Sequence, residues 1–153
     1  MGSNRRMDHM TWPEFKEAKT HPVIVPIGST EQHGQHLPIG TDAVLATRVA
    51  EDLAERIDGT VLPTLSYGYK SKPLSGGGPL FPGTIDMNGV TVITQMHDVL
   101  SELIADGFTK IVVMNAHFEN EAFIVDAIDL VTRETGGVAT IVETNWWDPV
   151  PQS

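Results

Sequence analysis

Two short clusters of acidic and imidazole side chains mark this chain, Glu31-Gln32-His33 and His117-Phe118-Glu119, and Asp42 follows soon after the first. Each cluster comes after an apolar, β-branched run that is typical of a buried strand. Carboxylates and imidazoles are the ligands with which proteins hold Zn, Mn and similar divalent cations. The pattern therefore predicts a metal site.

The donors are numerous enough for two cations. Two residues from each cluster and Asp42 give the predicted metal ligands Glu31, His33, Asp42, His117 and Glu119. If Asp42 bridges the ions, each ion has three protein ligands and an open position for water, as catalytic zinc has and structural zinc does not. Two neighbouring ions can share a hydroxide, lower its pKa and polarise a substrate carbonyl. This chemistry favours hydrolysis.

Each of these residues also has an ordinary structural interpretation. Asp42 could merely cap the helix that follows it, because Asp is among the best N-cap residues. A lone histidine is more often a hydrogen-bonded structural residue than a ligand, and the two glutamates could be solvated loop residues. The convergence of all the positions is what favours a metal. The remaining histidines are interpreted as surface or packing residues: His9, His21, His36 and His97. His36 is the one exception to follow, because it lies in the loop of the first cluster.

A parallel sheet would bring the two clusters together. The first cluster follows a predicted strand over 22–28, and the second follows a predicted strand over 110–114. Sites in open α/β sheets form beyond the carboxyl ends of the strands. Residues i and i+2 of an extended chain point to the same side, so each cluster can aim both ligands into one cavity. Asp42 begins the next helix, near the same edge.

Strand-like and helical patterns alternate along the chain, which predicts an α/β protein with a mainly parallel sheet. Its length suits a single domain over 1–153. Pro63 interrupts the second strand and favours an edge position or a bend. The Gly- and Pro-rich stretch 67–89 is long enough to indicate a functional loop or disorder. The predicted helices cover 42–57, 91–106 and 122–135, with a short helix starting at Thr11, and the predicted strands cover 22–28, 60–65, 110–114 and 138–142.

Composition narrows the classes of function. The formal net charge of -10 argues against a nucleic-acid partner, and the absence of cysteine excludes disulfides and thiol nucleophiles. No apolar stretch approaches the ~20 residues of a membrane span. No signal peptide is evident, so the expected location is the cytoplasm and the expected partner is a small molecule.

The glycine run Ser75-Gly76-Gly77-Gly78 does not fit a phosphate-binding loop, because no Lys-Ser or Lys-Thr pair follows it and nearby prolines exclude a helix start. Its glycines could let backbone N–H groups approach a small substrate, or they could form a flexible surface loop. Trp146 and Trp147 could belong to the core or could cover a pocket.

These residues resemble the creatininase family, the creatinine amidohydrolases. The resemblance implies a three-layer α/β/α fold, two divalent metal ions (commonly Zn and Mn), and a homo-oligomer, usually a hexamer. The matching stretches run in order across nearly the whole chain: Pro26 to Gly34, Asp42, Tyr67 to Ser71, Ser75 to Gly78, Phe81 to Thr84 and Asn115 to Asn120.

The family pattern assigns Glu31, Asp42 and His117 to one ion. It assigns His33, Asp42 and Glu119 to the other ion, and we also expect Glu119 to take part in catalysis. The expected substrate contacts are Ser75, Gly76, Gly77, Phe118 and Trp147.

The chain departs from the family pattern in two respects. Phe118 stands where family members often carry Tyr or Asn, which removes one polar contact to the substrate. Family chains also usually continue through a Glu-His-Gly/Ala segment and a Glu-Thr-Ser segment, which contribute a histidine to proton transfer and close the pocket. The chain is therefore expected to be a fragment, to need a second chain, or to form an incomplete site.

The resulting hypothesis is a binuclear metal-dependent amidohydrolase that opens a cyclic amide of creatinine type through a hydroxide shared by the ions. One alternative is a related hydrolase that acts on another small amide, a lactam or an oxidised cyclitol. Another is a catalytically incomplete subunit. A dinucleotide-binding protein is disfavoured, because no Gly-x-Gly-x-x-Gly sequence follows a strand.

Overall fold

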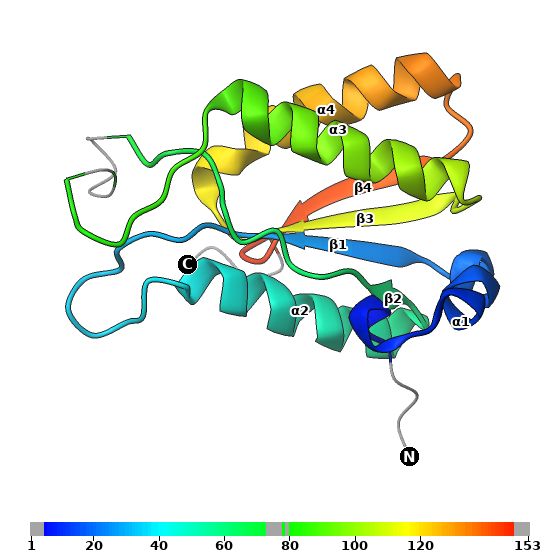
Figure 1. Cartoon of the computed structure of the whole chain (residues 1–153), viewed down its shortest axis with the longest axis horizontal. Helices are drawn as coiled ribbons and strands as arrows, with labels where there is room; N and C mark the ends of the chain where they lie inside the picture. Colours follow the sequence, from blue (N-terminus) through cyan, green and yellow to red (C-terminus); the bar gives the residue numbers. More distant parts are fainter. Residues whose placement is uncertain (1–4, 73–77, 79, 149–153) are drawn as a thin grey trace.

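The computed structural model of the chain describes residues 5–72, 78 and 80–148. Within these residues the centre is a four-stranded parallel sheet in the order β2-β1-β3-β4 (Figure 1). Every residue of β1 is buried, as expected for an inner strand that is covered on both faces. The strands are β1 Val23–Ile27, β2 Thr60–Val61, β3 Lys110–Asn115 and β4 Thr140–Asn145.

Helices cover both faces of the sheet. Helix α2 Thr41–Ile57 lies against one face, and α3 Gly89–Ala105 and α4 Glu121–Thr135 pack together on the other (Figure 1). This arrangement confirms the three-layer α/β/α fold. The side chains of α2 that are fully buried against the sheet are small, which lets the helix approach the strands closely: Ala46, Ala50 and Ala54.

Shorter helices lie at the two ends of the sheet. The helix α1 Trp12–Glu17 lies between the 3-10 helices η1 Met7–His9 and η2 Ala18–Thr20, on the side where the strands begin. The 3-10 helix η4 Phe118–Asn120 follows β3 and leads directly into α4.

Two strands differ from the sequence prediction by more than one residue at an end. β2 ends at Val61 rather than at residue 65, because Pro63 lacks the N–H that a regular ladder needs, and pairing resumes only as a bridge between Leu65 and Ile27. Its predicted edge position is confirmed. β4 begins at Thr140 rather than at residue 138, because the positive φ angles of Gly136 and Gly137 lengthen the turn that follows α4. It also ends at Asn145 rather than at residue 142, because it stays paired with β3 up to Asn115.

The register of the sheet aligns the carboxyl ends of three strands. Ile27 of β1 pairs with Asn115 of β3, which in turn pairs with Asn145 of β4. The segments that leave these strands therefore start at the same level on one edge. Both predicted ligand clusters follow strands at this edge.

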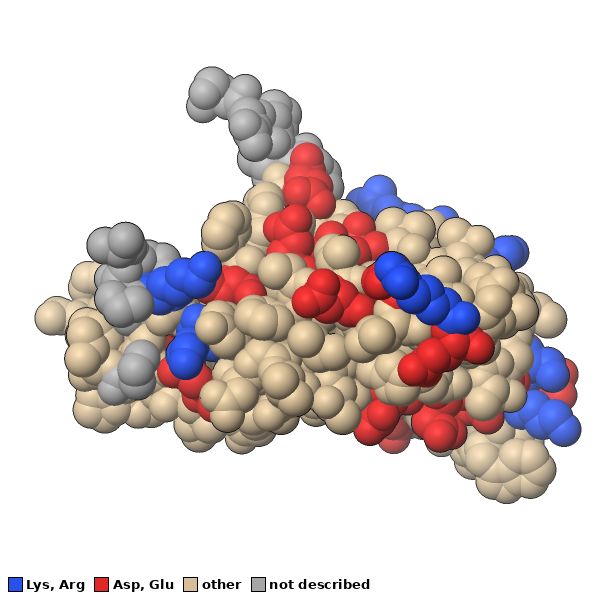
Figure 2. All heavy atoms as spheres, turned by 90° about the horizontal axis from the view of Figure 1, so that it is seen from above, with Lys and Arg blue, Asp and Glu red and all other residues tan. Residues whose placement is uncertain are grey.

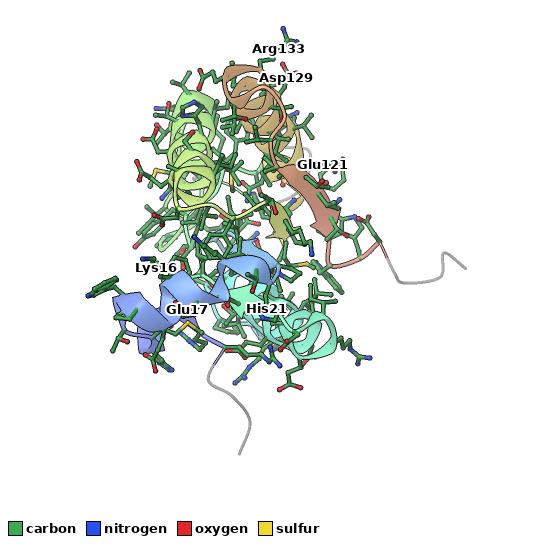
Figure 3. All side chains as sticks on the ribbon, turned by 90° about the vertical axis from the view of Figure 1, so that its right-hand side faces the viewer. Lys16, Glu17, His21, Glu121, Asp129 and Arg133 are labelled. Atoms are coloured by element: carbon green, nitrogen blue, oxygen red, sulfur yellow. The ribbon has the colours of Figure 1, made fainter. Side chains whose placement is uncertain are left out.

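Charged side chains also lie on the surface at the opposite edge of the sheet and on the outer helices. Figure 3 views the molecule from the amino ends of the strands, where Lys16, Glu17 and His21 project from the N-terminal segment. On the outside of α4, Arg133 Nε lies 2.9 Å from Asp129 Oδ2. Among the residues that the structure describes, the face formed by α3 and α4 shows acidic side chains with interspersed basic ones and no continuous basic patch (Figure 2). No helix in the described part of the chain combines the length and apolarity that a bilayer crossing requires.

Candidate metal centre

The predicted ligands gather at the carboxyl edge of the sheet. Glu31 and His33 lie in the loop between β1 and α2, Asp42 lies in the first turn of α2, and His117 follows β3. One donor atom from each of Glu31, Asp42 and His117 lies within 4.8 Å of the other two, and all three residues are buried. His33 joins this group through its contact with Asp42.

Asp42 offers one carboxylate oxygen to each histidine. Its Oδ1 lies 2.8 Å from His33 Nε2, and its Oδ2 lies 3.0 Å from His117 Nδ1. The interpretation of Asp42 as a helix cap is wrong, because the N-cap residue of α2 is Gly40. A carboxylate that presents its two oxygens to two different imidazoles has the form of a bridging ligand.

Backbone carbonyls orient both imidazoles. His117 Nε2–H donates to the carbonyl oxygen of Tyr69 at 2.8 Å, and His33 Nδ1–H donates to that of Glu31 at 3.2 Å. A carbonyl can only accept, so each bond fixes the ring nitrogen that carries hydrogen in the neutral imidazole. The other nitrogen of each ring faces Asp42, and it is the nitrogen that a cation would take in the neutral imidazole. Metal-binding histidines are commonly held in this way.

The group favours positive charge at its centre. Burial alone would lower the pKa of His117, but the neighbouring carboxylates of Asp42 and Glu31 outweigh burial and raise it to about 10. Burial also raises the pKa of Glu31, but hydrogen bonds from His117 and Ser71 outweigh it, and the pKa of this carboxyl lies below its ordinary value. In the metal-free protein, the proton on His117 thus lies among the carboxylates, at the position that would suit a metal cation.

Glu119 approaches the group from another side. Its Oε2 lies 3.5 Å from Nε2 of His117, on the ring edge opposite Asp42, and its side chain is only 8% exposed. The structure therefore brings Glu31, His33 and His117 around Asp42 and places Glu119 next to His117. The role of Glu119 as a ligand and in catalysis stays a prediction.

A cavity of about 770 Å³ lies beside Glu119. Tyr69, Lys72 and Phe118 contribute to its wall together with the first turns of α4. The ring of Phe118 is 69% exposed, and its centroid lies 6.1 Å from that of Trp147. Both aromatic residues predicted to contact substrate are thus placed together at this side of the site. The other predicted substrate contacts, Ser75, Gly76 and Gly77, lie outside the described residues.

Sequence reasoning missed the residues that support the ligands. Ser71 Oγ donates a short hydrogen bond to Glu31 Oε2, and the carbonyl of Tyr69 holds His117. Both residues belong to the stretch Tyr67 to Ser71, which matches the family. This match was the signal that could have identified them. Asp86 was also missed: it interacts electrostatically with Glu31 and His117, and burial raises the pKa of its carboxyl.

The donor set fits divalent cations. Carboxylates and imidazoles suit Zn and Mn, and the ring nitrogens that face Asp42 are the ones that the backbone hydrogen bonds leave for a cation. Two buried polar atoms near the group, Ser29 Oγ and Asp86 Oδ1, also have no hydrogen-bond partner among the described residues. Buried polar atoms are normally paired, so a bound ligand or its water would complete the site.

Gly28 sets the distance between β1 and Asp42. A Cβ at this position would lie 2.5 Å from the backbone nitrogen of Ala43 and 2.6 Å from the carbonyl carbon of Asp42. We expect Gly28→Ala to lower the free energy of unfolding by about 1–3 kcal/mol and to weaken metal binding, because backbone must move. Gly40→Ala is the comparison variant, since its added Cβ meets no atom within 4 Å beyond its chain neighbours. Its loss of stability should be limited to the weaker N-cap that Ala provides for α2, with metal binding unchanged. Urea unfolding and metal titration would measure both effects, and equal behaviour of the two variants would contradict this account.

The comparisons with known proteins agree with this geometry. A model of the creatininase family, described as creatinine amidohydrolase, matches residues 8–152. The creatinine amidohydrolase of Pseudomonas putida is 40% identical over 146 residues, covering 91% of this chain and 56% of the relative. The 3-dehydro-scyllo-inosose hydrolase of Thermotoga maritima is 32% identical over 128 residues, covering 84% of this chain and 40% of the relative. The chain thus spans about half the length of these relatives.

Solved structures show the same fold. A creatininase variant of Zn-Zn type superposes with a TM-score of 0.94 at 36% identity, covering 99% of this chain and 61% of that one. A variant complexed with creatine gives a TM-score of 0.94 at 37% identity, covering 98% and 61% of the two chains. A structure described as creatininase Mn gives a TM-score of 0.91 at 38% identity, covering 95% and 60%.

Proposed function

This chain belongs to the creatininase family, and we propose that it carries the metal-binding part of a hydrolase that opens a cyclic amide of creatinine type. The observation that carries the proposal is the position of Asp42 between two imidazoles, each oriented by a backbone carbonyl. We propose two divalent cations, Zn or Mn or one of each, by analogy with the Zn-Zn and Mn relatives. A homo-oligomer, or a second chain that completes the site, belongs to the same proposal.

The proposed ligand sets share Asp42. Glu31 and His117 would hold one ion with it, and His33 and Glu119 would hold the other. The ions would supply an activated water and a polarised substrate carbonyl. The proposal is supported by the convergence of the imidazole nitrogens of His33 and His117 on the two oxygens of Asp42.

The cavity beside Glu119 is the proposed entry for the substrate. Phe118 and Trp147 would pack against a small planar ring, because aromatic side chains cover such ligands with apolar surface. Glu119 lies between this cavity and His117, where its carboxylate could accept and return a proton. The backbone at Ser75, Gly76 and Gly77 is proposed to approach the substrate closely.

A second candidate substrate is an oxidised cyclitol. The relative described as 3-dehydro-scyllo-inosose hydrolase matches this chain over 128 residues, and Phe118 offers no hydroxyl to a creatinine-like ring. The metal ligands would serve the same purpose with either substrate, because each presents a carbonyl to be attacked. The cavity wall would determine which one binds.

Metal analysis and a substrate panel test the proposal. We expect the protein, after dialysis against Zn or Mn, to retain two ions per chain and to hydrolyse creatinine or another small amide, lactam or cyclitol ketone. Glu119→Gln should lose the second ion and reduce turnover by about 100-fold or more, because it removes a charged ligand. Glu55→Gln is the control, since this carboxylate is exposed on α2 and does not line the cavity. Absence of bound metal from the unmutated protein would refute the proposal.

A further inference from the structure

Asn120 lies at the start of α4 without capping it. It occupies the N-cap position, where an Asn side chain ordinarily accepts a hydrogen bond from the helix backbone, yet it makes no such bond. The residue is fully buried. The amide group of Asn120 therefore does not cap α4, and its hydrogen bonds go to other segments.

The side chain of Asn120 instead connects three segments. Its Nδ2 donates to the carbonyl oxygen of Gly28 at 3.0 Å and lies 3.4 Å from Oδ1 of Asn115. Its Oδ1 accepts from the backbone N–H of Tyr69 at 2.8 Å. Asn120 thus joins the end of β1, the end of β3 and the segment around Tyr69 in one place. The packing is tight, because a Cβ on Gly68 would lie 2.6 Å from Asn120 Oδ1.

Each of these segments carries or supports a predicted ligand. Gly28 leads into the loop with Glu31, and the carbonyl of Tyr69 holds the imidazole of His117. Asn115 Oδ1 also accepts from the backbone N–H of His117 at 3.0 Å. The two halves of the ligand set come from distant parts of the sequence, and Asn120 is bonded to both.

We propose that Asn120 is a positioning residue, which holds the loop of Glu31 and the carbonyl that orients His117 in a fixed relation so that their donors can share cations. This inference rests on the proposed metal site and adds to it a residue that contacts no metal. Residues that orient metal ligands commonly change affinity by about 10–100-fold when they are replaced.

Asn120→Ala and Asn120→Asp test this role. The alanine removes all three contacts, whereas the aspartate keeps the acceptor for Tyr69 but places a carboxylate oxygen against the carbonyl of Gly28 and Oδ1 of Asn115. Val131→Ala is the control, because Val131 is fully buried in the same helix but contributes to the apolar core. The cavity that Val131→Ala leaves in the core should lower the stability of the fold, but it removes no contact of the segments that carry the predicted ligands.

Zn affinity and backbone amide exchange are the two measurements. We expect both Asn120 variants to bind Zn about 10–100-fold more weakly than the unmutated protein, with an altered visible spectrum of the Co-substituted form. In the metal-free protein, the Tyr69 amide should exchange much faster in Asn120→Ala than in Val131→Ala. Unchanged Zn affinity and unchanged Tyr69 exchange in Asn120→Ala would overturn the inference. If the unmutated protein binds no Zn, the proposed function fails, whereas the exchange result still decides whether Asn120 holds these segments.

Discussion

Asp42→Asn is expected to abolish binding of both metal ions. Each oxygen of the Asp42 carboxylate faces a different histidine, at 2.8 Å and 3.0 Å, so a single substitution changes both predicted ligand sets. The amide keeps the size of the side chain but removes its negative charge and replaces one acceptor with a donor. We expect Zn affinity to fall by about 100-fold or more at both positions, and turnover to fall with it.

Isothermal titration with Zn, and metal analysis of the dialysed protein, would measure this loss. Asp52→Asn is the matched control, because Asp52 lies on the same helix but is exposed. It should bind both ions like the unmutated protein. Loss of one ion alone in Asp42→Asn would show that the carboxylate serves a single cation and is not shared.

Metal binding is expected to release a proton from His117. The carboxylates around this imidazole raise its pKa to about 10, so the metal-free protein holds the proton at neutral pH. A cation binds only the neutral imidazole and must therefore displace this proton. Metal affinity should therefore rise by about tenfold per pH unit for each proton released, and this rise should level off above the pKa of His117.

The same shift affects the metal-free fold. The folded pKa of His117 lies above its ordinary value of 6.5, so the charged imidazole stabilises the fold fully below that value. This contribution is lost as the pH rises through about 10. With metal bound the dependence should largely disappear, because the cation replaces the proton among the carboxylates.

Titrations with Zn in buffers of different ionisation enthalpy would count the released protons. His97→Gln is the control, because His97 pairs with Glu134 at 2.7 Å on the exposed surface and its pKa is also raised. That variant should release the same number of protons as the unmutated protein. A proton count of zero at neutral pH would contradict the predicted state of His117.

The fold, and the convergence of the predicted ligands at one edge of the sheet, could be predicted because their signals are local. Short apolar runs alternate with amphipathic helices, and the clusters at Glu31 and His117 each follow such a run. A parallel sheet then brings its carboxyl ends to one edge, whatever the details of packing. The boundaries of β2 and β4 were less predictable, since they depend on how Pro63 and the Gly136-Gly137 turn meet their neighbours.

The supporting contacts could not be predicted in this way. The carbonyl of Tyr69 is a backbone atom and leaves no mark in the sequence, and Ser71 and Asp86 meet Glu31 only through the folding of a long irregular loop. Asn120 illustrates the difficulty. Its position before α4 predicts a helix cap, whereas its amide bonds Gly28 and Tyr69, which lie far away in sequence.

Anomalous X-ray scattering from crystals grown with Zn or Mn would locate the cations themselves. Two metal peaks are expected at the carboxyl edge of the sheet, one near Glu31 and His117 and one near His33, with Asp42 between them and bonded to both. A single peak that does not touch Asp42, or no peak at this edge, would contradict this expectation.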